Sequence, residues 1–215
     1  ACGTDARCMT DRRRDVAAAF FIEQEFQQTG AFIYGMYEGS LGRMPTYSEF
    51  SVDRPQLVAS PNLEALKQEF TTNFVQRTEF VARYQTYDSP ESFVDAMIGT
   101  VQQASGVDLS ARRPSLLNRY NAGGTQIESR SLVVKDIIED TSFRQAEYTR
   151  AFVLSEYFSY LRRDPEPGGF AFWVDVLNNR DTGNYRGMVC AFITSSEYQT
   201  RFSSVVSQRN SDCGQ

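Results

Sequence analysis

The chain repeats one pattern of residues, and this repetition constrains its fold more than any single residue does. The pattern is an aromatic-rich helix, a Leu-x-Arg-x-Pro turn and a tail of the form Phe-x4-Glu-aromatic. The clearest copy occupies 152–202, and an earlier copy occupies 32–84. Repetition of this kind indicates stacked modules that present a surface, rather than one enclosed pocket. The corresponding residues are Phe32 and Phe152, Leu41 and Leu161, Arg43 and Arg163, Pro45 and Pro165, Phe74 and Phe192, Glu79 and Glu197, Phe80 and Tyr198, and Tyr84 and Phe202.

Two weaker fragments extend the pattern to the rest of the chain. AFFIEQEFQ at 19–27 matches AFITSSEYQ at 191–199, and VKDIIEDTSF at 134–143 is a degenerate tail with Ser142 in place of Glu. We therefore expect repeats of about 50 residues, in a chain whose numbering starts inside a longer array or precursor. The predicted divisions are 1–30 (tail of a truncated unit with a disulfide loop), 31–88 (first unit), 89–147 (degenerate second unit) and 148–215 (third unit with a C-terminal extension).

Local signals predict helices almost throughout. Apolar spacing predicts a helix over 11–28 that stops at Gly30, and Ser60-Pro61 starts one that reaches about Tyr84. Ser89-Pro90 repeats that start signal, and Thr194 with Glu197 forms a predicted capping box. Alternation with a period of two is almost absent, so the predicted fold is all-α, a helical bundle built from the repeats.

Composition excludes several classes of partner. Hydrophobic residues make up 41% of the chain and charged residues 23%, which is typical of a globular protein. No apolar run approaches the roughly 18 residues that span a bilayer, so we expect no membrane-spanning segment. The net charge of −5 argues against nucleic acid as a partner, because neutralising phosphates needs a basic surface.

The four cysteines point to an oxidising compartment. Cys2 and Cys8 bracket a short loop, while Cys190 and Cys213 lie near the other end of the chain. Pairing within each end is the simplest of three connectivities, and it predicts a secreted or envelope location. The alternative is that Cys190 is a buried free thiol. A zinc site is a poor explanation, because the chain has no His to join the thiolates.

The sequence shows no catalytic motif. The absence of His excludes Ser-His-Asp and Cys-His arrangements, and Gly168-Gly169 lacks the Lys-Ser/Thr of a phosphate-binding loop. Acid pairs such as Asp164 and Glu166 suit helix ends better than a glycosidase site. A calcium site at the same acids lacks the alternating ligands of an EF-hand. We therefore expect no enzyme activity, no cofactor and no metal.

With these residues in hand, the chain resembles the domain of unknown function 4214, a repeat module of bacterial surface and secreted proteins. Its signature is a Leu-Gly-Arg-x-Pro-Asp turn, a Gly-aromatic-x-x-Trp helix and a Ser-x-Glu-Phe tail. The earlier copy keeps Gly42 but has Asp53 where Trp is expected. The later copy matches the signature at Leu161, Arg163, Pro165, Gly169, Trp173, Ser195, Glu197 and Tyr198.

The resemblance implies an all-helical, non-catalytic module at the bacterial cell surface or outside the cell. We therefore expect a structural protein that forms homo-oligomers, as a layer or filament subunit. The alternative is a module that binds polysaccharide or lipopolysaccharide and attaches a larger protein to the cell. In that interpretation, exposed Tyr160 and Trp173 would stack on sugars, while Arg163 and Asp164 would bond their hydroxyl groups.

Overall fold

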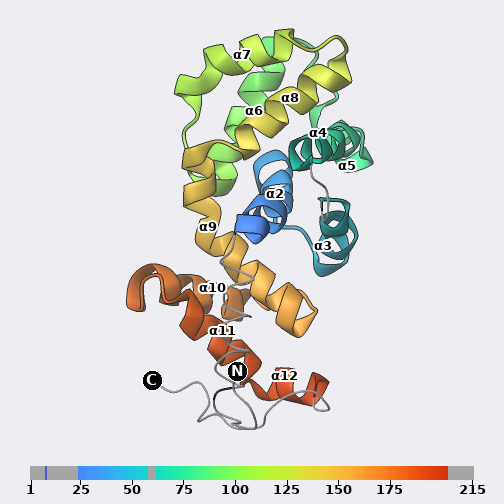
Figure 1. The fold of residues 1–215 in the computed structure, drawn as a ribbon. Coiled ribbons are helices and arrows are strands. Elements are labelled where there is room, and N and C mark those ends of the chain that lie inside the picture. The colour runs from blue at the N-terminus through green and yellow to red at the C-terminus, as the bar shows by residue number, and fades with distance from the viewer. Residues whose placement is uncertain (1–7, 9–23, 58–61, 203–215) are drawn as a thin grey trace. The chain divides into compact units, whose positions relative to one another are not determined.

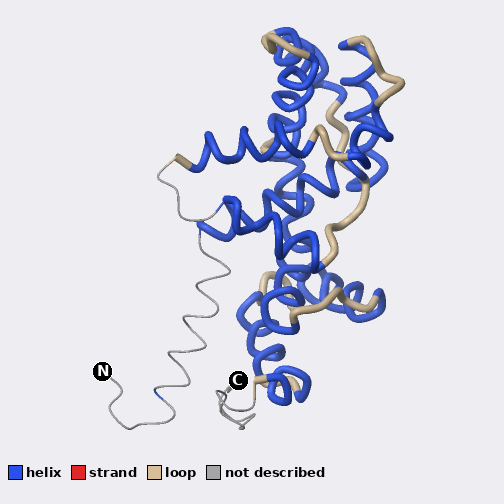
Figure 2. Tube along the Cα trace, turned by 90° about the vertical axis from the view of Figure 1, so that its right-hand side faces the viewer, coloured by secondary structure: helices blue, strands red, loops and turns tan. Residues whose placement is uncertain are grey.

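The computed structural model describes residue 8 and the ranges 24–57 and 62–202. Helices joined by loops make up this part of the chain, with no strand among the described residues, so the predicted all-α class is confirmed (Figures 1 and 2). The α-helices are α2 (Gln24–Leu41), α3 (Tyr47–Asp53), α4 (Leu63–Phe74), α5 (Thr78–Tyr84), α6 (Pro90–Ser105), α7 (Arg113–Asn121), α8 (Gln126–Ile138), α9 (Thr141–Glu156), α10 (Pro167–Asp175), α11 (Tyr185–Ile193) and α12 (Ser196–Arg201).

The chain divides into two compact units. One unit is formed by 29–148, and the other combines 1–28 with 149–215. Short 3₁₀ turns follow α3 and precede α7, and π-helical turns follow α9 and α10. None of the helices described here combines the length and the apolar character needed to cross a membrane. The division of the chain into four parts at the predicted boundaries stays a prediction.

Aromatic rings fill the core of the 29–148 unit. The Phe80 ring lies 4.6 Å from that of Tyr84 and 6.3 Å from that of Phe93, measured between centroids. Phe74 joins the same stack at 6.5 Å from Phe80. All four side chains are almost completely buried. Edge-to-face and tilted rings of this kind add to the free energy gained by burying their area, so they hold α4, α5 and α6 together.

Helix α2 is longer than its sequence predicts. The predicted stop at Gly30 is wrong, because α2 runs from Gln24 to Leu41 through three glycines. Two of them allow close packing: a Cβ atom at Gly35 would lie 2.8 Å from Ile138, and one at Gly39 would lie 2.5 Å from it. Contact with Ile138 therefore compensates for the low helix propensity of glycine. The predicted helix over 11–28 lies largely outside the described residues.

The helix predicted from Ser60-Pro61 to Tyr84 is two helices. Residues 60 and 61 lie outside the described ranges, and Asn62 caps α4 by accepting a hydrogen bond from the Ala65 backbone. The helix then breaks after Phe74, and α5 begins at Thr78. The break lets Phe74 and Phe80 both face the core. By contrast, Ser89-Pro90 starts α6 as predicted, with a capping box between Ser89 and Ser92.

The second unit contains the end of α9 and the elements after it. The π-helical turn η3 (Tyr157–Leu161) continues α9, and Tyr157 packs edge-on against Phe192 of α11 at 5.0 Å. The predicted capping box at Thr194 is wrong, because Ser195 caps α12 by accepting from the Tyr198 backbone. Glu197 is therefore free of the capping role, and its carboxylate bonds to Arg163 instead.

Glu156 is the most unusual buried group in this unit. It is 0% exposed, and neither carboxylate oxygen has a hydrogen-bond partner in the structure as described. Burial raises the pKa of Glu156 well above its ordinary value. In the earlier copy of the sequence pattern the same position is Met36, which is also fully buried. The helix therefore places an acid where its counterpart holds an apolar side chain.

We predict that Glu156→Met raises the free energy of unfolding by about 1–3 kcal/mol at neutral pH, because no unpaired polar group is then buried. The folded state holds the Glu156 proton more tightly than the unfolded state, whose pKa is near 4.5. The contribution of Glu156 to stability should therefore be fully present below about pH 4.5 and be lost as the pH rises towards its folded-state pKa. Thermal unfolding across pH measures both effects.

The matched control is Glu91→Gln, at an exposed position in the first turn of α6. It should leave the dependence of stability on pH unchanged, whereas Glu156→Gln should flatten it. Equal pH profiles for wild type and Glu156→Gln would contradict this account.

Candidate functional site

The sequence pattern places an arginine directly after a helix end in the 29–148 unit. Helix α2 ends at Leu41, and Gly42 adopts a φ of 72°, a left-handed conformation that glycine reaches without strain. The chain then passes through Arg43 to Thr46, which caps α3. Thr46 and Glu49 form a capping box, each bonding to the other's backbone N–H. The turn is therefore fixed at both helix ends.

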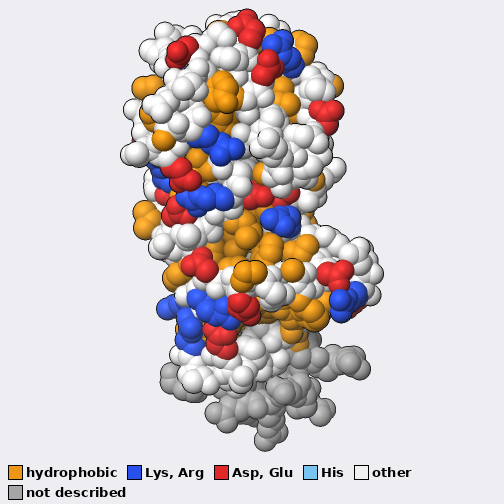
Figure 3. Space-filling view, turned by 180° about the vertical axis from the view of Figure 1, so that it is seen from behind, with side chains coloured by type: hydrophobic (Ala, Val, Ile, Leu, Met, Phe, Trp, Pro, Cys, Tyr) orange, Lys and Arg blue, Asp and Glu red, His pale blue; other side chains and the backbone are white. Residues whose placement is uncertain are grey.

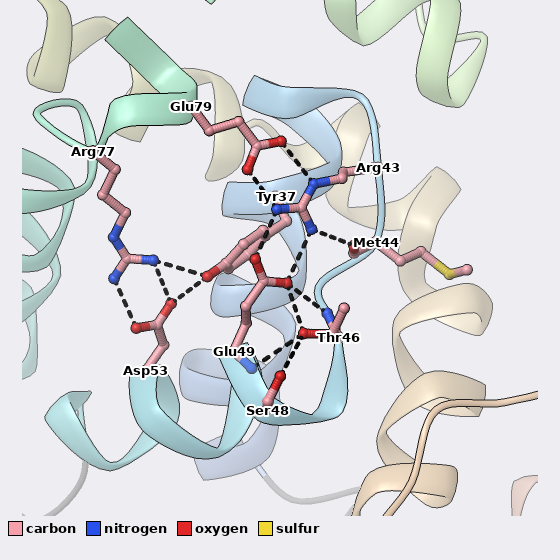
Figure 4. Close-up of polar contacts among 9 residues, drawn as sticks. All are labelled: Tyr37, Arg43, Met44, Thr46, Ser48, Glu49, Asp53, Arg77 and Glu79. Atoms are coloured by element: carbon pink, nitrogen blue, oxygen red, sulfur yellow. Dashed lines mark hydrogen bonds and ion pairs between the residues drawn. The ribbon is translucent and has the colours of Figure 1, made fainter. Parts of the chain in front are cut away.

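Arg43 is held by carboxylates from two directions (Figure 4). Its Nε donates to Glu79 Oε1 at 2.8 Å and its Nη2 to Glu79 Oε2 at 2.6 Å, which is a two-bond fork. Its Nη1 donates to Glu49 Oε2 at 3.0 Å and to the Met44 carbonyl at 3.1 Å. The guanidinium also lies 5.1 Å from the centre of the Tyr37 ring. We call Tyr37, Arg43, Glu49 and Glu79 the Arg43 cluster.

The charges in this cluster stabilise one another. Burial opposes ionisation of Glu49, but hydrogen bonds from Arg43 and Thr46 outweigh it and lower the pKa of Glu49 to about 2. The hydrogen bond from Arg43 likewise lowers the pKa of Glu79, and the bonds to Glu79 and then Glu49 raise the pKa of Arg43. Each group is therefore charged at neutral pH and already occupied by its neighbours.

A second polar group lies beside the Arg43 cluster. Asp53 is only 2% exposed, and it accepts two bonds of 2.7 Å from the Arg77 guanidinium. The Tyr37 hydroxyl donates to Asp53 Oδ2 at 2.7 Å and accepts from Arg77 Nη1 at 2.8 Å (Figure 4). Burial, followed by the hydrogen bond to Asp53, raises the pKa of Tyr37. Asp53 therefore has its buried charge paired and bonded, as a stable interior charge requires.

The second unit contains a cluster of the same design, formed by Tyr157, Arg163, Glu166 and Glu197, which we call the Arg163 cluster. Arg163 Nε and Nη2 donate to the two Glu197 oxygens at 2.7 and 2.8 Å. Its Nη1 donates to Glu166 Oε2 at 2.5 Å and to the Asp164 carbonyl at 3.0 Å. Its guanidinium lies 5.3 Å from the Tyr157 ring centre. The tail glutamate and the next carbonyl are thus bound by the same arginine atoms in both clusters. The second glutamate differs, because Glu49 and Glu166 stand at different positions of the pattern and Arg43 Nη2 also donates to Glu49 Oε1 at 2.7 Å.

The aromatic surroundings of the two clusters agree as closely. The Tyr37–Phe74 centroids are 5.1 Å apart with an interplanar angle of 85°, and those of Tyr157 and Phe192 are 5.0 Å apart at 85°. The turn before each arginine is also left-handed, at Gly42 with a φ of 72° and at Arg162 with a φ of 48°. Arg162 pays for that conformation with steric strain that glycine avoids.

The clusters differ in what covers the tyrosine. In the pattern, Trp173 stands where the first copy has Asp53, and Ser195 stands where it has Arg77. The Trp173 ring packs on Phe192 at 5.7 Å, and Ser195 serves as a helix cap. An aromatic side chain therefore takes the position of a buried ion pair, although the arginine fork is the same in both clusters.

The four predicted glycan-binding residues lie near one another in sequence but differ in exposure. Tyr160 is only 8% exposed, so the expectation that its ring lies at the surface is wrong. Its side chain continues the buried face of the helix through the π-helical turn η3. Arg163 is engaged by Glu166 and Glu197, Asp164 is exposed, and Trp173 is half-buried. Binding of a glycan by these residues stays a prediction.

The predicted cysteine pairs are only partly covered by the structure. Cys190 is buried in α11, and Cys8 is half-buried. Cys2 and Cys213 lie outside the described residues, so the pairing stays a prediction. In the degenerate tail at 134–143, Asp140 pairs with Arg112, whereas position 142 holds Ser where the pattern has Glu.

The described residues hold no group of three or more His, Cys, Asp or Glu side chains that could bind a metal ion. On the face drawn in Figure 3, basic and acidic side chains lie next to one another rather than in a block of one sign.

The forked bond between arginine and tail glutamate was not predicted from the sequence, although both partners belong to the repeated pattern. Their recurrence together, Arg43 with Glu79 and Arg163 with Glu197, was the signal that could have revealed it.

We predict that Arg43→Gln and Arg163→Gln each lower the free energy of unfolding by about 0.5–1.5 kcal/mol, because partly solvated carboxylates lose a forked partner. Lysine at either position should restore only part of the loss, since it cannot form two parallel bonds. Urea unfolding of the variants measures the effect.

The Arg43 variant also makes a prediction about pH. The pKa of Glu49 is lowered in the folded state, so its stabilisation is present above about 4.5 and is lost as the pH falls towards about 2. Arg43→Gln should lack this acid-sensitive part. Arg119→Gln, which removes a single bond of 3.2 Å to Asp136, is the matched control and should change little. Indistinguishable results for Arg43→Gln and Arg119→Gln would refute a stabilising role for the fork.

Comparison with known proteins supplies one match. No curated protein and no solved structure matches this chain. A family model described as "Domain of unknown function (DUF4214)" matches residues 135–202. The matched range contains the whole Arg163 cluster, whereas the earlier copy at 32–84 lies outside it. The resemblance predicted for the later copy is therefore confirmed, and the C-terminal part of this chain matches the DUF4214 family.

Proposed function

We propose that this chain is a non-catalytic structural protein of the bacterial cell surface or extracellular space. In this proposal it self-assembles, as a layer or filament subunit, through repeated helical modules of about 50 residues. The observation that carries the proposal is the pair of matching clusters around Arg43 and Arg163. The two arginines bond their tail glutamates and the next carbonyl through the same atoms, and each also bonds a second glutamate, Glu49 or Glu166, at a different position after the arginine.

The matching clusters support repetition at the level of structure as well as sequence. A pattern of residues can recur by chance, or because the same residues favour helices. The forked bond needs more, because the tail helix must pack beside the turn that carries the arginine. Glu79 begins this return in α5 and Glu197 does so in α12. The aromatic pair that follows each glutamate is also spaced alike. The ring centroids of Phe80 and Tyr84 are 4.6 Å apart, and those of Tyr198 and Phe202 are 4.8 Å apart.

Repetition favours assembly because repeated modules present repeated surfaces. A contact that one module makes can be made again by its counterpart, and heterologous contacts of this kind extend into filaments or layers. The polar groups of the turn also support a structural role. Arg43 and Arg163 are already bonded by carboxylates of their own chain, so a ligand would have to displace those bonds.

The second candidate function is binding of a polysaccharide or lipopolysaccharide. One observation favours it: Trp173 is half-buried, so part of its ring can contact a ligand, and the adjacent Phe172 is 48% exposed. Aromatic rings at a surface can pack against the apolar faces of sugars. Because Tyr160 is buried, Trp173 would be the main aromatic contact with the glycan among the four predicted residues.

We predict that the purified protein forms particles larger than its 24.4 kDa monomer as its concentration rises. Light scattering after size separation gives the mass, and electron microscopy gives the regularity of the particles. A monomer at every concentration would contradict self-assembly and direct attention to an array of bacterial polysaccharides. In that case, loss of glycan binding in Trp173→Ala but not in Tyr160→Phe would support the second function.

We also predict two disulfides, Cys2–Cys8 and Cys190–Cys213, consistent with a location outside the cytoplasm. Mass spectrometry of an unreduced digest of the secreted protein should find both linked peptides. Reduction should lower the stability by about 2–4 kcal/mol for each bond. Full alkylation of the four cysteines in denaturant without reductant would rule out the pairs.

A further inference from the structure

The buried acid Glu156 lies at the point where α9 changes into the π-helical turn η3. Its side chain is completely buried, and neither carboxylate oxygen has a hydrogen-bond partner within the described part of the chain. A charge removed from water needs a partner, because desolvation without one is costly. Glu156 is therefore buried as the uncharged acid, and it has to leave the interior when it becomes charged.

The elements around this acid supply no opposite charge. Helices α11 and α12 pack against η3. Their charged and titratable side chains are Tyr185, Arg186, Cys190, Glu197, Tyr198 and Arg201. None of them bonds to Glu156, whose pKa is raised by burial alone. Arg201 pairs with Glu197 instead. In the turn itself, burial and then the charge of Glu156 raise the pKa of Tyr160, so the nearest titratable hydroxyl does not favour a carboxylate either.

The turn that follows this acid carries contacts that hold the second unit together. The Tyr157 ring lies 5.0 Å from the Phe192 ring of α11, and the guanidinium of the Arg163 cluster lies 5.3 Å from its centre. The Tyr160 ring packs edge-on against the Tyr198 ring of α12 at 5.7 Å. A side chain that leaves the interior directly before η3 therefore moves both of these aromatic contacts.

The earlier copy offers an internal comparison, because its interior has no acid at this position. The corresponding residue is Met36, which is fully buried and stays uncharged at every pH. Two buried acids elsewhere in the 29–148 unit have partners: Asp53 is bonded to Arg77, and Glu147 accepts a bond of 2.5 Å from Tyr34. The unpartnered acid is thus a feature of the second unit.

The composition of the chain makes this acid easy to observe. The chain has no histidine. Ordinary carboxyl groups titrate near pH 4 and free thiols near pH 8.5. Between about pH 5 and pH 7.5, an ordinary side chain of this protein therefore does not change its charge. Buried glutamic acids can keep their proton up to about pH 8–9. A structural change in this range is therefore attributable to a buried acid.

We propose that Glu156 controls a pH-dependent opening of the second unit. On opening, its carboxyl gives its proton to water, the charged side chain becomes solvated, and η3 separates from α11 and α12. The opened carboxyl ionises near pH 4.5, whereas the closed one keeps its proton. The ratio of open to closed molecules therefore rises about tenfold per pH unit above that value, until the closed form also ionises. This inference concerns the folding of one unit and is independent of self-assembly.

Hydrogen exchange of the full chain, followed by mass spectrometry of its peptides from about pH 5 to about pH 7.5, tests the proposal. After correction for the intrinsic exchange rate at each pH, opening of η3, α11 and α12 should increase about tenfold per pH unit. Peptides of α4, α5 and α6 should show no such increase. Glu156→Gln should abolish the increase, because the amide has no proton to lose in this range.

Two further variants complete the test. Glu156→Met, which carries the side chain of the earlier copy, should also abolish the increase, and it serves if Glu156→Gln is poorly folded by circular dichroism. Glu91→Gln, at an exposed position of α6, is the matched control and should keep the wild-type profile.

Three results would overturn the proposal. Opening of the second unit that does not change with pH would exclude the switch. An unchanged increase in folded Glu156→Gln and Glu156→Met would assign it to another group. An equal increase in the peptides of α4, α5 and α6 would show an effect on the stability of the whole chain. The mass of the particles in solution, which tests self-assembly, is measured separately and is not decided by any of these results.

Discussion

The forked bond between an arginine after a helix end and a glutamate far along the chain organises each unit. Arg43 reaches Glu79 and Arg163 reaches Glu197, so a turn and a distant tail helix are held at a fixed separation. The fork depends on planar, bidentate geometry that lysine cannot supply. In both units the guanidinium lies against a tyrosine ring, and the tail helix carries a closely packed aromatic pair.

The interior around this fork is more variable than the fork itself. Where one unit buries Asp53 against Arg77, the other packs Trp173 on Phe192, and where one buries Met36, the other buries Glu156. These exchanges change polarity but retain the helix ends and the direction of the tail. The module therefore keeps its helix ends and its fork while the side chains of its interior differ.

Several features followed from the sequence and several did not. The start of α6 at Ser89-Pro90 was predictable because a cap and a proline act locally. The continuation of α2 through Gly30 was not, because it depends on Ile138 approaching Gly35 and Gly39 from a helix a hundred residues later. Tyr160 was expected at the surface, but the π-helical turn leaves it buried. The predicted cap at Thr194 is replaced by Ser195, and Glu197 bonds to Arg163 from another part of the unit, which the local sequence does not reveal.

By itself, the sequence determined the helical class, the start of α6 and the recurrence of the pattern, because caps, apolar spacing and repeated residues act within a few positions. Only the tertiary structure decided that Glu79 and Glu197 turn back onto Arg43 and Arg163, and that Tyr160 is buried. Those outcomes depend on which distant helices meet. Such contacts join residues that are far apart in the sequence, so local patterns do not predict them.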